Sequence, residues 1–241
     1  MTASDTSKNA PFGFSILHDS DTDIGRVLLR RRWSLALERD VFEMTMDGKL
    51  MMSSAVAVSE IALAERTLAL LPDQTLRVLI GGLGFGFTAQ AALADARVCE
   101  VTVIERLAPV IAWHRSGIFP WSEEFMADPR LRIVWGDFFA PGIHETDACY
   151  DAILVDIDDS PSLLWHGSHA AFYTSTGLET FRTHLRPRGV FGLWCATHPG
   201  DAFMAMAENV FARSELTEVP FENPCLRQPE INYILLAMAH R

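Results

Sequence analysis

Long apolar runs, serine-hydrolase turns and phosphate-binding loops are all absent from this sequence. No apolar run reaches the roughly 18–20 residues that a membrane-spanning helix needs, so we expect no membrane partner. The polar stretch 1–12 lacks the apolar core of a secretory signal, and we expect it to be disordered. Neither a Walker motif nor a G-x-S-x-G turn is present, which leaves nucleotidase and hydrolase functions without support.

Cysteine is scarce and positive charge is in the minority. The four cysteines lie far apart without a C-x-x-C pair, which is typical of thiols in a reducing compartment, so we expect a cytoplasmic protein. There are 20 Lys and Arg against 31 Asp and Glu, and the formal net charge is −11. An acidic surface repels phosphate backbones, which argues against a nucleic-acid partner but is compatible with a cationic small molecule.

The apolar residues that are present follow two patterns along the chain. Residues 1–60 contain short strand-like runs after the polar tail and predict a small β-rich unit. Residues 61–241 alternate apolar strands with amphipathic helices, which predicts a Rossmann-like, doubly wound and mostly parallel sheet. We therefore expect an α/β protein with two domains that divide after residue 60.

The individual elements follow from the same patterns. The helix that opens the second region should have Ser59 as its N-cap and end before Pro72. The expected strands are 14–17, 26–29, 41–44, 50–52, 76–80, 100–104, 131–134, 151–155, 190–194, 217–221 and 231–237. The other expected helices are 88–96, 109–114, 177–185 and 202–212. The last two strands could pair as an antiparallel hairpin at the sheet edge.

A glycine-rich turn follows the strand 76–80. Gly82, Gly84 and Gly86 carry no Cβ, so the backbone can turn sharply and approach a ligand at the start of the next helix. Glu105 ends the following strand, about 20 positions further on, where a carboxylate can accept hydrogen bonds from two ribose hydroxyls. The alternatives are a tight structural turn and a surface acid at a strand end.

The third strand of this region ends in a turn that fits the same kind of site. Asp137 can accept a hydrogen bond from an adenine amino group, and the ring of Phe138 can pack on the base. By itself such a turn is common. In order with the glycine turn and Glu105, it predicts a nucleoside-binding cradle at the carboxyl ends of three strands.

Three carboxylates crowd the end of the strand 151–155. Asp156, Asp158 and Asp159 lie so close in sequence that joint ionisation is disfavoured, and at least one pKa should rise. A carboxylate with a raised pKa can take a proton from an ammonium or hydroxyl nucleophile. We expect Asp156 to point into the site because it directly follows the strand. Capping of the loop or of the next helix is the alternative role.

Two histidines follow in the same loop. His166 and His169 could form a metal site with Asp156 and Asp158. Loop histidines are more often surface or hydrogen-bonding groups, and we expect no metal.

These motifs, in this order, resemble those of the spermidine synthase family, the polyamine aminopropyltransferases. The resemblance runs from Asp47 to Trp194. Asp47-Gly48 resembles the family's LDG turn, VLIGGLGFG its VLIIGGGDG, VTVIE its acid-terminated second strand and GDFF its GDA-type turn. YDAILVDIDDSP resembles its YDVIIVDSSDP. The resemblance implies a small N-terminal β domain before a Rossmann domain of the S-adenosylmethionine-dependent methyltransferase type.

The resemblance also implies roles for individual residues. Glu105 would bind ribose, Asp137 would bind adenine, and Asp156 would deprotonate the attacking amine with Asp159 near it. Glu60 and Asp158 are the further candidates for substrate binding. The implied donor is decarboxylated S-adenosylmethionine or S-adenosylmethionine, the implied acceptor is a small-molecule amine, and the implied assembly is a homodimer.

Three departures from the family's pattern fall on the amine half of the site. Phe85 replaces the Asp that holds the donor's amino group, Met51 stands where a Gln is usual, and Val58-Ser59-Glu60 replaces Tyr-His-Glu. Aminopropyl or related transfer, methyl transfer and a non-catalytic binding role therefore all stay open. An NAD-dependent dehydrogenase has less support, because nothing in the chain resembles a hydride-transfer site.

Overall fold

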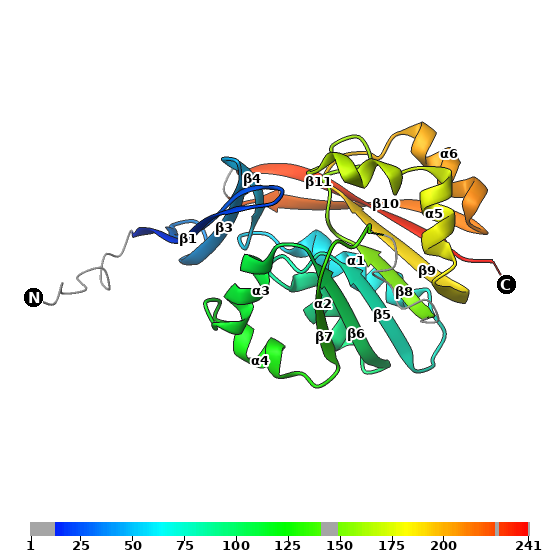
Figure 1. Cartoon of the computed structure of the whole chain (residues 1–241), viewed down its shortest axis with the longest axis horizontal. Helices are drawn as coiled ribbons and strands as arrows, with labels where there is room; N and C mark the ends of the chain where they lie inside the picture. The colour runs from blue at the N-terminus through cyan, green and yellow to red at the C-terminus, as the bar shows by residue number, and fades with distance from the viewer. Residues whose placement is uncertain (1–12, 141–148, 225–226, 241) are drawn as a thin grey trace, which may run out of the picture. The chain divides into compact units, whose positions relative to one another are not determined.

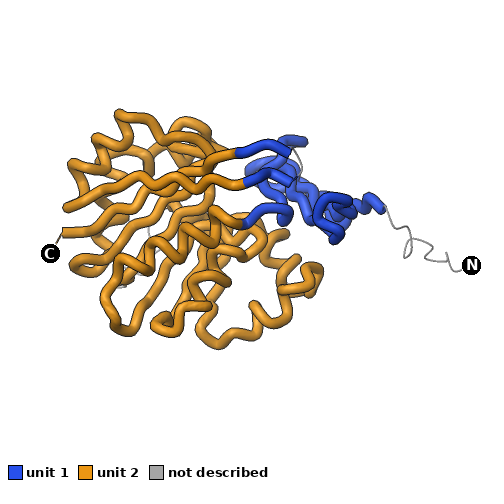
Figure 2. Tube along the Cα trace, turned by 180° about the vertical axis from the view of Figure 1, so that it is seen from behind, with its two compact units in different colours: residues 1–57, 222–229 blue, residues 58–221, 230–241 orange. Residues whose placement is uncertain are grey.

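The structure is a computed structural model that describes residues 13–140, 149–224 and 227–240 (Figure 1). The expected disorder of residues 1–12 and the thiol of Cys225 lie outside these ranges. The chain divides into two compact units (Figure 2), one of residues 1–57 with 222–229 and one of residues 58–221 with 230–241. The contacts thus place the division after Ala57, close to the boundary expected after residue 60.

The smaller unit contains a four-stranded antiparallel sheet in the order β1-β2-β3-β4. The turn between β3 and β4 has left-handed backbone at Asp47 (φ 48°) and Gly48 (φ 81°), a conformation that suits a tight hairpin. The β-rich unit expected in this region is therefore confirmed, with longer strands than the apolar runs indicated. The strands are β1 (Phe14–Thr22), β2 (Gly25–Ser34), β3 (Arg39–Met46) and β4 (Lys49–Ser53).

The larger unit is built on a seven-stranded sheet in the order β10-β11-β9-β8-β5-β6-β7. All neighbours from β9 to β7 are parallel, whereas β11 is antiparallel to β9. The doubly wound, mostly parallel sheet is confirmed, and β10 and β11 lie next to each other at its edge as expected. The strands are β5 (Leu76–Gly81), β6 (Val98–Glu105), β7 (Leu131–Trp135), β8 (Tyr150–Val155), β9 (Leu185–Cys195), β10 (Arg213–Asn223) and β11 (Gln228–Met238).

Helices pack on both faces of this sheet (Figure 1). Gly192 in β9 lets the first helix approach closely, because a Cβ there would lie 2.5 Å from Thr67 Oγ1 and 3.0 Å from Leu63 Cδ1. Within the described residues, no helix combines the length and apolarity that crossing a membrane requires. The helices are α1 (Val58–Ala69), α2 (Phe87–Ala94), α3 (Ala108–Arg115), α4 (Ser122–Ala127), α5 (Ser175–Arg182), α6 (Asp201–Val210) and the 3-10 helix η1 (Gly167–Ala171).

Two local expectations were wrong, and one short helix was missed. Ser59 is not an N-cap but lies inside the first turn of α1, where its hydroxyl donates to Glu60 Oε2 at 2.8 Å. The helix expected at 177–185 ends at Arg182, and Leu185 already belongs to β9. The short helix α4 was not expected at all. It has no side-chain cap, and the ring of its residue Phe125 packs against the ring of His114.

Candidate active site

The glycine turn after β5 has the left-handed backbone that only glycine adopts readily. The φ values are 93° at Gly82, 48° at Gly84 and 84° at Gly86. A Cβ on Gly82 would collide with the carbonyl oxygen of Asp156, and the Asp156 N–H donates to Gly81 O at 2.9 Å. The turn therefore lies directly beside the end of β8, and Gly82 is required for this approach.

Phe85 anchors the turn to the helices α3 and α4. Its side chain is buried, and its ring packs edge-on against Phe119 (centroids 5.3 Å apart) and Trp121 (6.5 Å). Trp121 Nε1 donates to Phe85 O at 2.9 Å, and His114 Nε2 bonds to Gly84 O at the same distance. Burial lowers the pKa of His114, which favours the neutral ring. The two aromatic residues Phe119 and Trp121 were the sequence signal for this contact.

Glu105 closes the turn from the neighbouring strand. It is the last residue of β6, and its carboxylate accepts hydrogen bonds from the N–H of Leu83 at 2.8 Å and of Leu107 at 2.7 Å. Burial raises the pKa of this carboxyl, while the two backbone N–H groups oppose the rise. The structure thus brings Glu105 to the glycine turn, and its role in ribose binding stays a prediction.

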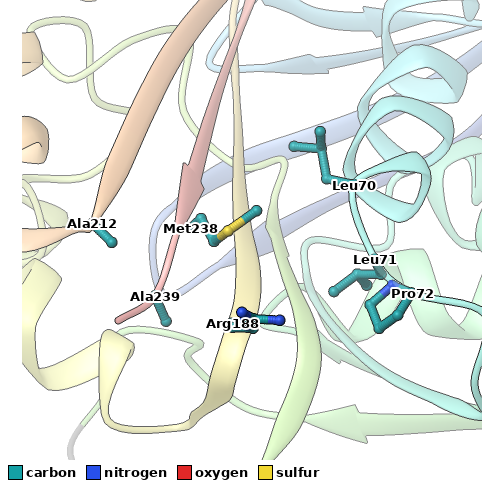
Figure 3. Close-up of a pocket in the computed structure, with 7 residues that line it drawn as sticks. All are labelled: Leu70, Leu71, Pro72, Arg188, Ala212, Met238 and Ala239. Carbon is teal, nitrogen blue, oxygen red and sulfur yellow. The ribbon is translucent and has the colours of Figure 1, made fainter. Parts of the chain in front are cut away.

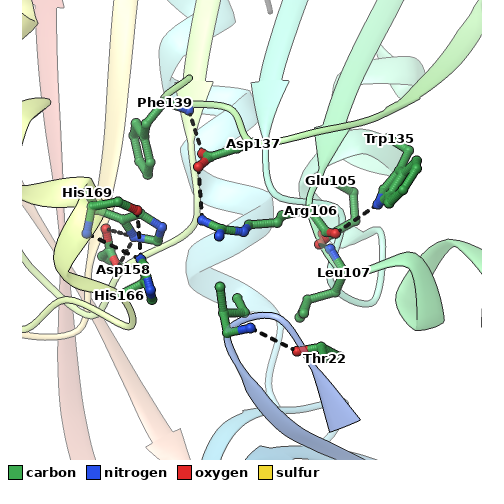
Figure 4. A network of polar contacts seen from close by, with 12 residues as sticks. Thr22, Glu105, Arg106, Leu107, Trp135, Asp137, Phe139, Asp158, His166 and His169 are labelled. Carbon is green, nitrogen blue, oxygen red and sulfur yellow. Dashed lines mark hydrogen bonds and ion pairs between the residues drawn. The ribbon is translucent and has the colours of Figure 1, made fainter. Parts of the chain in front are cut away.

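Asp137 and Phe138 follow β7 and separate into different environments. Asp137 Oδ1 accepts from the N–H of Phe139 at 2.9 Å, and Oδ2 pairs with Arg106 Nη1 at 2.9 Å (Figure 4). Phe138 is buried in the core under Gly81, where a Cβ would lie 2.7 Å from its ring. The partly exposed aromatic beside Asp137 is therefore Phe139, which the sequence did not single out.

Asp156 and Glu60 form a pair of carboxyl groups with raised pKa values. Thr88 Oγ1 donates to Asp156 Oδ2 at 2.6 Å, and burial raises the pKa of Asp156 to about 6. Burial and then the charge of Asp156 raise the pKa of Glu60 to about 7. The rise expected of one carboxyl in the acidic run is thus found at Asp156, with burial as its main cause. The pair joins α1 to the end of β8.

Asp158 turns away into its own loop. Its buried carboxylate accepts from Trp165 N–H at 2.7 Å, from His169 Nδ1 at 2.9 Å and from Tyr173 OH at 3.0 Å. Binding a substrate amine here would require one of these partners to leave, so its role in substrate binding stays a prediction. Asp159 is partly buried, and its carbonyl oxygen accepts from Ala196 N–H at 2.7 Å.

A metal centre is not supported at this loop. Among residues 13–140, 149–224 and 227–240, no group of three or more His, Cys, Asp or Glu is placed to hold a metal ion. His169 bonds to Asp158 instead, and His166 Nδ1 accepts from Ser168 N–H at 3.2 Å.

A surface hollow of about 440 Å³ lies at the other end of the strands (Figure 3). It is formed where α1 leads into β5 and where β9 begins, whereas the glycine turn follows the carboxyl end of β5. None of the predicted site residues lines it. The lining residues are Leu70, Leu71, Pro72, Arg188, Ala212, Met238 and Ala239.

The sheet order and the glycine turn after β5 define a Rossmann-type unit, in which Glu105 and Asp156 also lie at the carboxyl ends of parallel strands. No family model matches the chain. In sequence the chain is similar to polyamine aminopropyltransferase 2 of Pseudomonas aeruginosa, with 29% identity over 167 residues, covering 67% of this chain and 46% of that protein. The chain therefore spans about half the length of this curated relative.

Solved structures agree with this similarity. A spermidine synthase in complex with the transition-state analogue AdoDATO matches with a TM-score of 0.73 and 21% identity, covering 92% of this chain and 73% of that one. Human methyltransferase-like protein 13 in complex with SAH matches with a TM-score of 0.50 and 22% identity, covering 76% and 80%. At these identities the structures show the fold alone. The methyltransferase-type fold and the resemblance to the spermidine synthase family are thus confirmed.

Proposed function

We propose that this chain is a transferase that moves an alkyl group from an adenosyl sulfonium to a small-molecule amine. The observation that carries the proposal is the carboxyl pair of Asp156 and Glu60 beside a glycine turn closed by Glu105. The similarity to a polyamine aminopropyltransferase and to a spermidine synthase bound to AdoDATO supports it. Decarboxylated S-adenosylmethionine is the donor that fits these relatives.

The donor would lie against the glycine turn. Gly82, Gly84 and Gly86 let its adenosyl part approach the backbone, Glu105 takes the ribose hydroxyls and Asp137 lies at the base. Each of these residues ends or follows a parallel strand at its carboxyl end, which is where ligands bind in open α/β sheets. No metal takes part in this scheme.

The reaction requires an amine without its extra proton. The amine lone pair attacks the carbon beside the sulfonium, the C–N bond forms, the C–S bond breaks, and its electron pair neutralises the sulfur. The proton lost by the amine goes to Asp156, whose pKa of about 6 suits a base near neutral pH. Glu60 and Asp159 would hold the amine, and alignment of the two reactants accounts for most of the remaining acceleration.

Methyl transfer from S-adenosylmethionine itself is the second candidate. The observation that favours it is Phe85, which packs among aromatic rings and gives the turn no carboxylate for the donor's amino group. The same nucleoside site would serve, and the sulfur product would be adenosylhomocysteine in place of methylthioadenosine.

The two reactions are separated by their sulfur products. Purified protein is incubated with putrescine and either donor, and methylthioadenosine and adenosylhomocysteine are measured by mass spectrometry. We expect methylthioadenosine from the decarboxylated donor, and a loss of about 10²-fold or more in Asp156→Asn. Absence of both products, with donor binding that Asp156→Asn leaves unchanged, would instead favour a non-catalytic binding protein.

The cellular setting is part of the same proposal. A homodimer in the cytoplasm is what the family resemblance and the scattered cysteines suggest. Light scattering on the purified chain tests the dimer, because a monomer at the concentration used for the activity assay would rule it out as the active form.

A further inference from the structure

The loop after β8 brings an imidazole to the turn after β7. His169 lies in η1, and only 3% of its surface is exposed. Its ring centroid is 4.7 Å from that of Phe139, the partly exposed aromatic beside Asp137. Figure 4 shows His169, Phe139, Asp137 and Arg106 grouped in one region, although they come from three separate loops.

The buried carboxylate of Asp158 fixes which nitrogen of His169 carries hydrogen. Nδ1 lies 2.9 Å from Asp158 Oδ1 and 3.0 Å from Oδ2, and an ionised carboxylate only accepts hydrogen bonds. The hydrogen therefore sits on Nδ1, and a ring with this single N–H presents Nε2 as an acceptor. Within the described part of the chain, no hydrogen-bond partner faces Nε2. Tyr173 and Trp165 bond to the same carboxylate and hold it in place.

Asp137 has both of its oxygens engaged before any ligand arrives. Oδ1 accepts from the N–H of Phe139, and Oδ2 pairs with Arg106. Trp135 Nε1 donates to the carbonyl oxygen of Arg106 at 3.0 Å, which fixes the backbone from which the guanidinium extends. Each oxygen of Asp137 thus already accepts one hydrogen bond, and Nε2 of His169 is a further acceptor for an amino group that enters this region.

We propose that Nε2 of His169 accepts a hydrogen bond from the exocyclic amino group of the donor's adenine and so selects a 6-aminopurine. This inference rests on the proposed function, because it places the adenosyl group beside Asp137. His169 is then a specificity-determining residue that touches the ligand, while Asp158 and Tyr173 are positioning residues. A 6-oxopurine would place a carbonyl oxygen against Nε2, and two acceptors facing each other repel.

The test compares two nucleosides on the full chain. Binding of 5′-methylthioadenosine and 5′-methylthioinosine is measured by calorimetry for the native protein, His169→Asn, His169→Gln and Tyr173→Phe. Asn can still donate to Asp158 from the place of Nδ1 but has nothing at the place of Nε2, whereas Gln can reach that place. We expect the native protein to prefer the amino compound, and His169→Asn to lower the preference about tenfold.

The controls separate recognition from stability. Tyr173→Phe removes one hydrogen bond to Asp158 but leaves His169 intact, so it should keep the preference even if its melting temperature falls. His169→Gln should keep more of the preference than His169→Asn. An unchanged preference in a folded His169→Asn would overturn the inference while leaving the adenosyl site standing. Failure of the native protein to bind either nucleoside would overturn the proposed function as well.

Discussion

Single residues of the same type have different chemistry in this molecule because their surroundings differ. Asp156 and Asp158 stand two positions apart after β8, yet Asp158 is held by three donors of its own loop. Asp156 receives one hydrogen bond, from Thr88, and lies close enough to Glu60 to raise the pKa of that carboxyl. The first arrangement fixes a loop, and the second raises the pKa of both carboxyl groups, which is the property that the proposed proton transfer requires.

The raised pKa values of Asp156 and Glu60 make the stability of the chain depend on pH. Their ordinary values are 3.8 and 4.5, and in the folded chain they rise to about 6 and about 7. At a pH between the ordinary and the raised pKa values, the folded state binds more protons than the unfolded state. The stability that the pair contributes is therefore full at about pH 4 and is lost as the pH rises through 7.

We expect Glu60→Gln to remove part of this dependence. Urea unfolding at pH 5 and at pH 8 gives the free energy of unfolding at each pH. From pH 5 to pH 8 this free energy should fall by about 1–2 kcal/mol more in the native chain than in Glu60→Gln. Glu65→Gln is the matched control, because Glu65 lies in the same helix with an exposed side chain. Equal losses in Glu60→Gln and the native chain would contradict the coupling of this pair.

At the scale of elements, the turn between β5 and α2 depends on the absence of a side chain at one point. Gly82 has a φ of 93°, and a Cβ there would collide with the backbone of Asp156. Gly117 also has a left-handed φ, 69°, but a Cβ there would meet nothing within 4 Å. A side chain at Gly117 would therefore cause backbone strain alone, whereas a side chain at Gly82 would cause both strain and a steric clash.

Substitution of each glycine by Ala tests this difference. Gly117→Ala should cost only the strain of a left-handed residue, about 1–2 kcal/mol. Gly82→Ala should cost several kcal/mol more and should abolish binding of methylthioadenosine, because the turn must move away from β8. Urea unfolding and calorimetry measure both effects. Similar costs in the two variants would mean that the close approach of the turn to β8 is not required.

The elements that the sequence predicted are those with a strong apolar period of their own. The strands β5, β6 and β8 are mostly apolar, and the residues that follow or end them, Gly82, Glu105 and Asp156, were predicted as site residues from that position. The helix α4 could not be predicted, because it spans six residues and has no side-chain cap. Its formation depends on rings that come from other parts of the chain.

The contacts between loops could not be predicted from the sequence either. Arg106 pairs with Asp137, and His169 packs on Phe139, across separations that no local pattern encodes. The choice between Phe138 and Phe139 depended on which ring of the turn after β7 packs against Gly81. Two adjacent aromatic residues in a turn carry no period that would decide it, so only the packed structure does.

At the scale of the whole molecule, the strand order explains why distant residues meet. From β5 the sheet continues through β6 and β7 on one side and through β8 and β9 on the other. The loops after β6 and after β8 therefore leave the sheet on opposite sides of β5. Glu105 comes from one side and Asp156 from the other, and both lie at the glycine turn although they belong to opposite halves of one sheet.

The net charge of the whole chain should act differently on the cationic acceptor and on the uncharged sulfur product. At −11 the protein attracts a cationic amine over a distance comparable with the Debye length, about 10 Å at 0.1 M salt. Raising the salt from about 0.02 M to about 0.3 M should therefore lower kcat/KM for putrescine severalfold while kcat changes little. Methylthioadenosine is uncharged and provides the internal control, since its affinity should stay constant over the same range. An unchanged kcat/KM would mean that the amine is attracted by the carboxyl groups of the site alone and not by the net charge of the whole molecule.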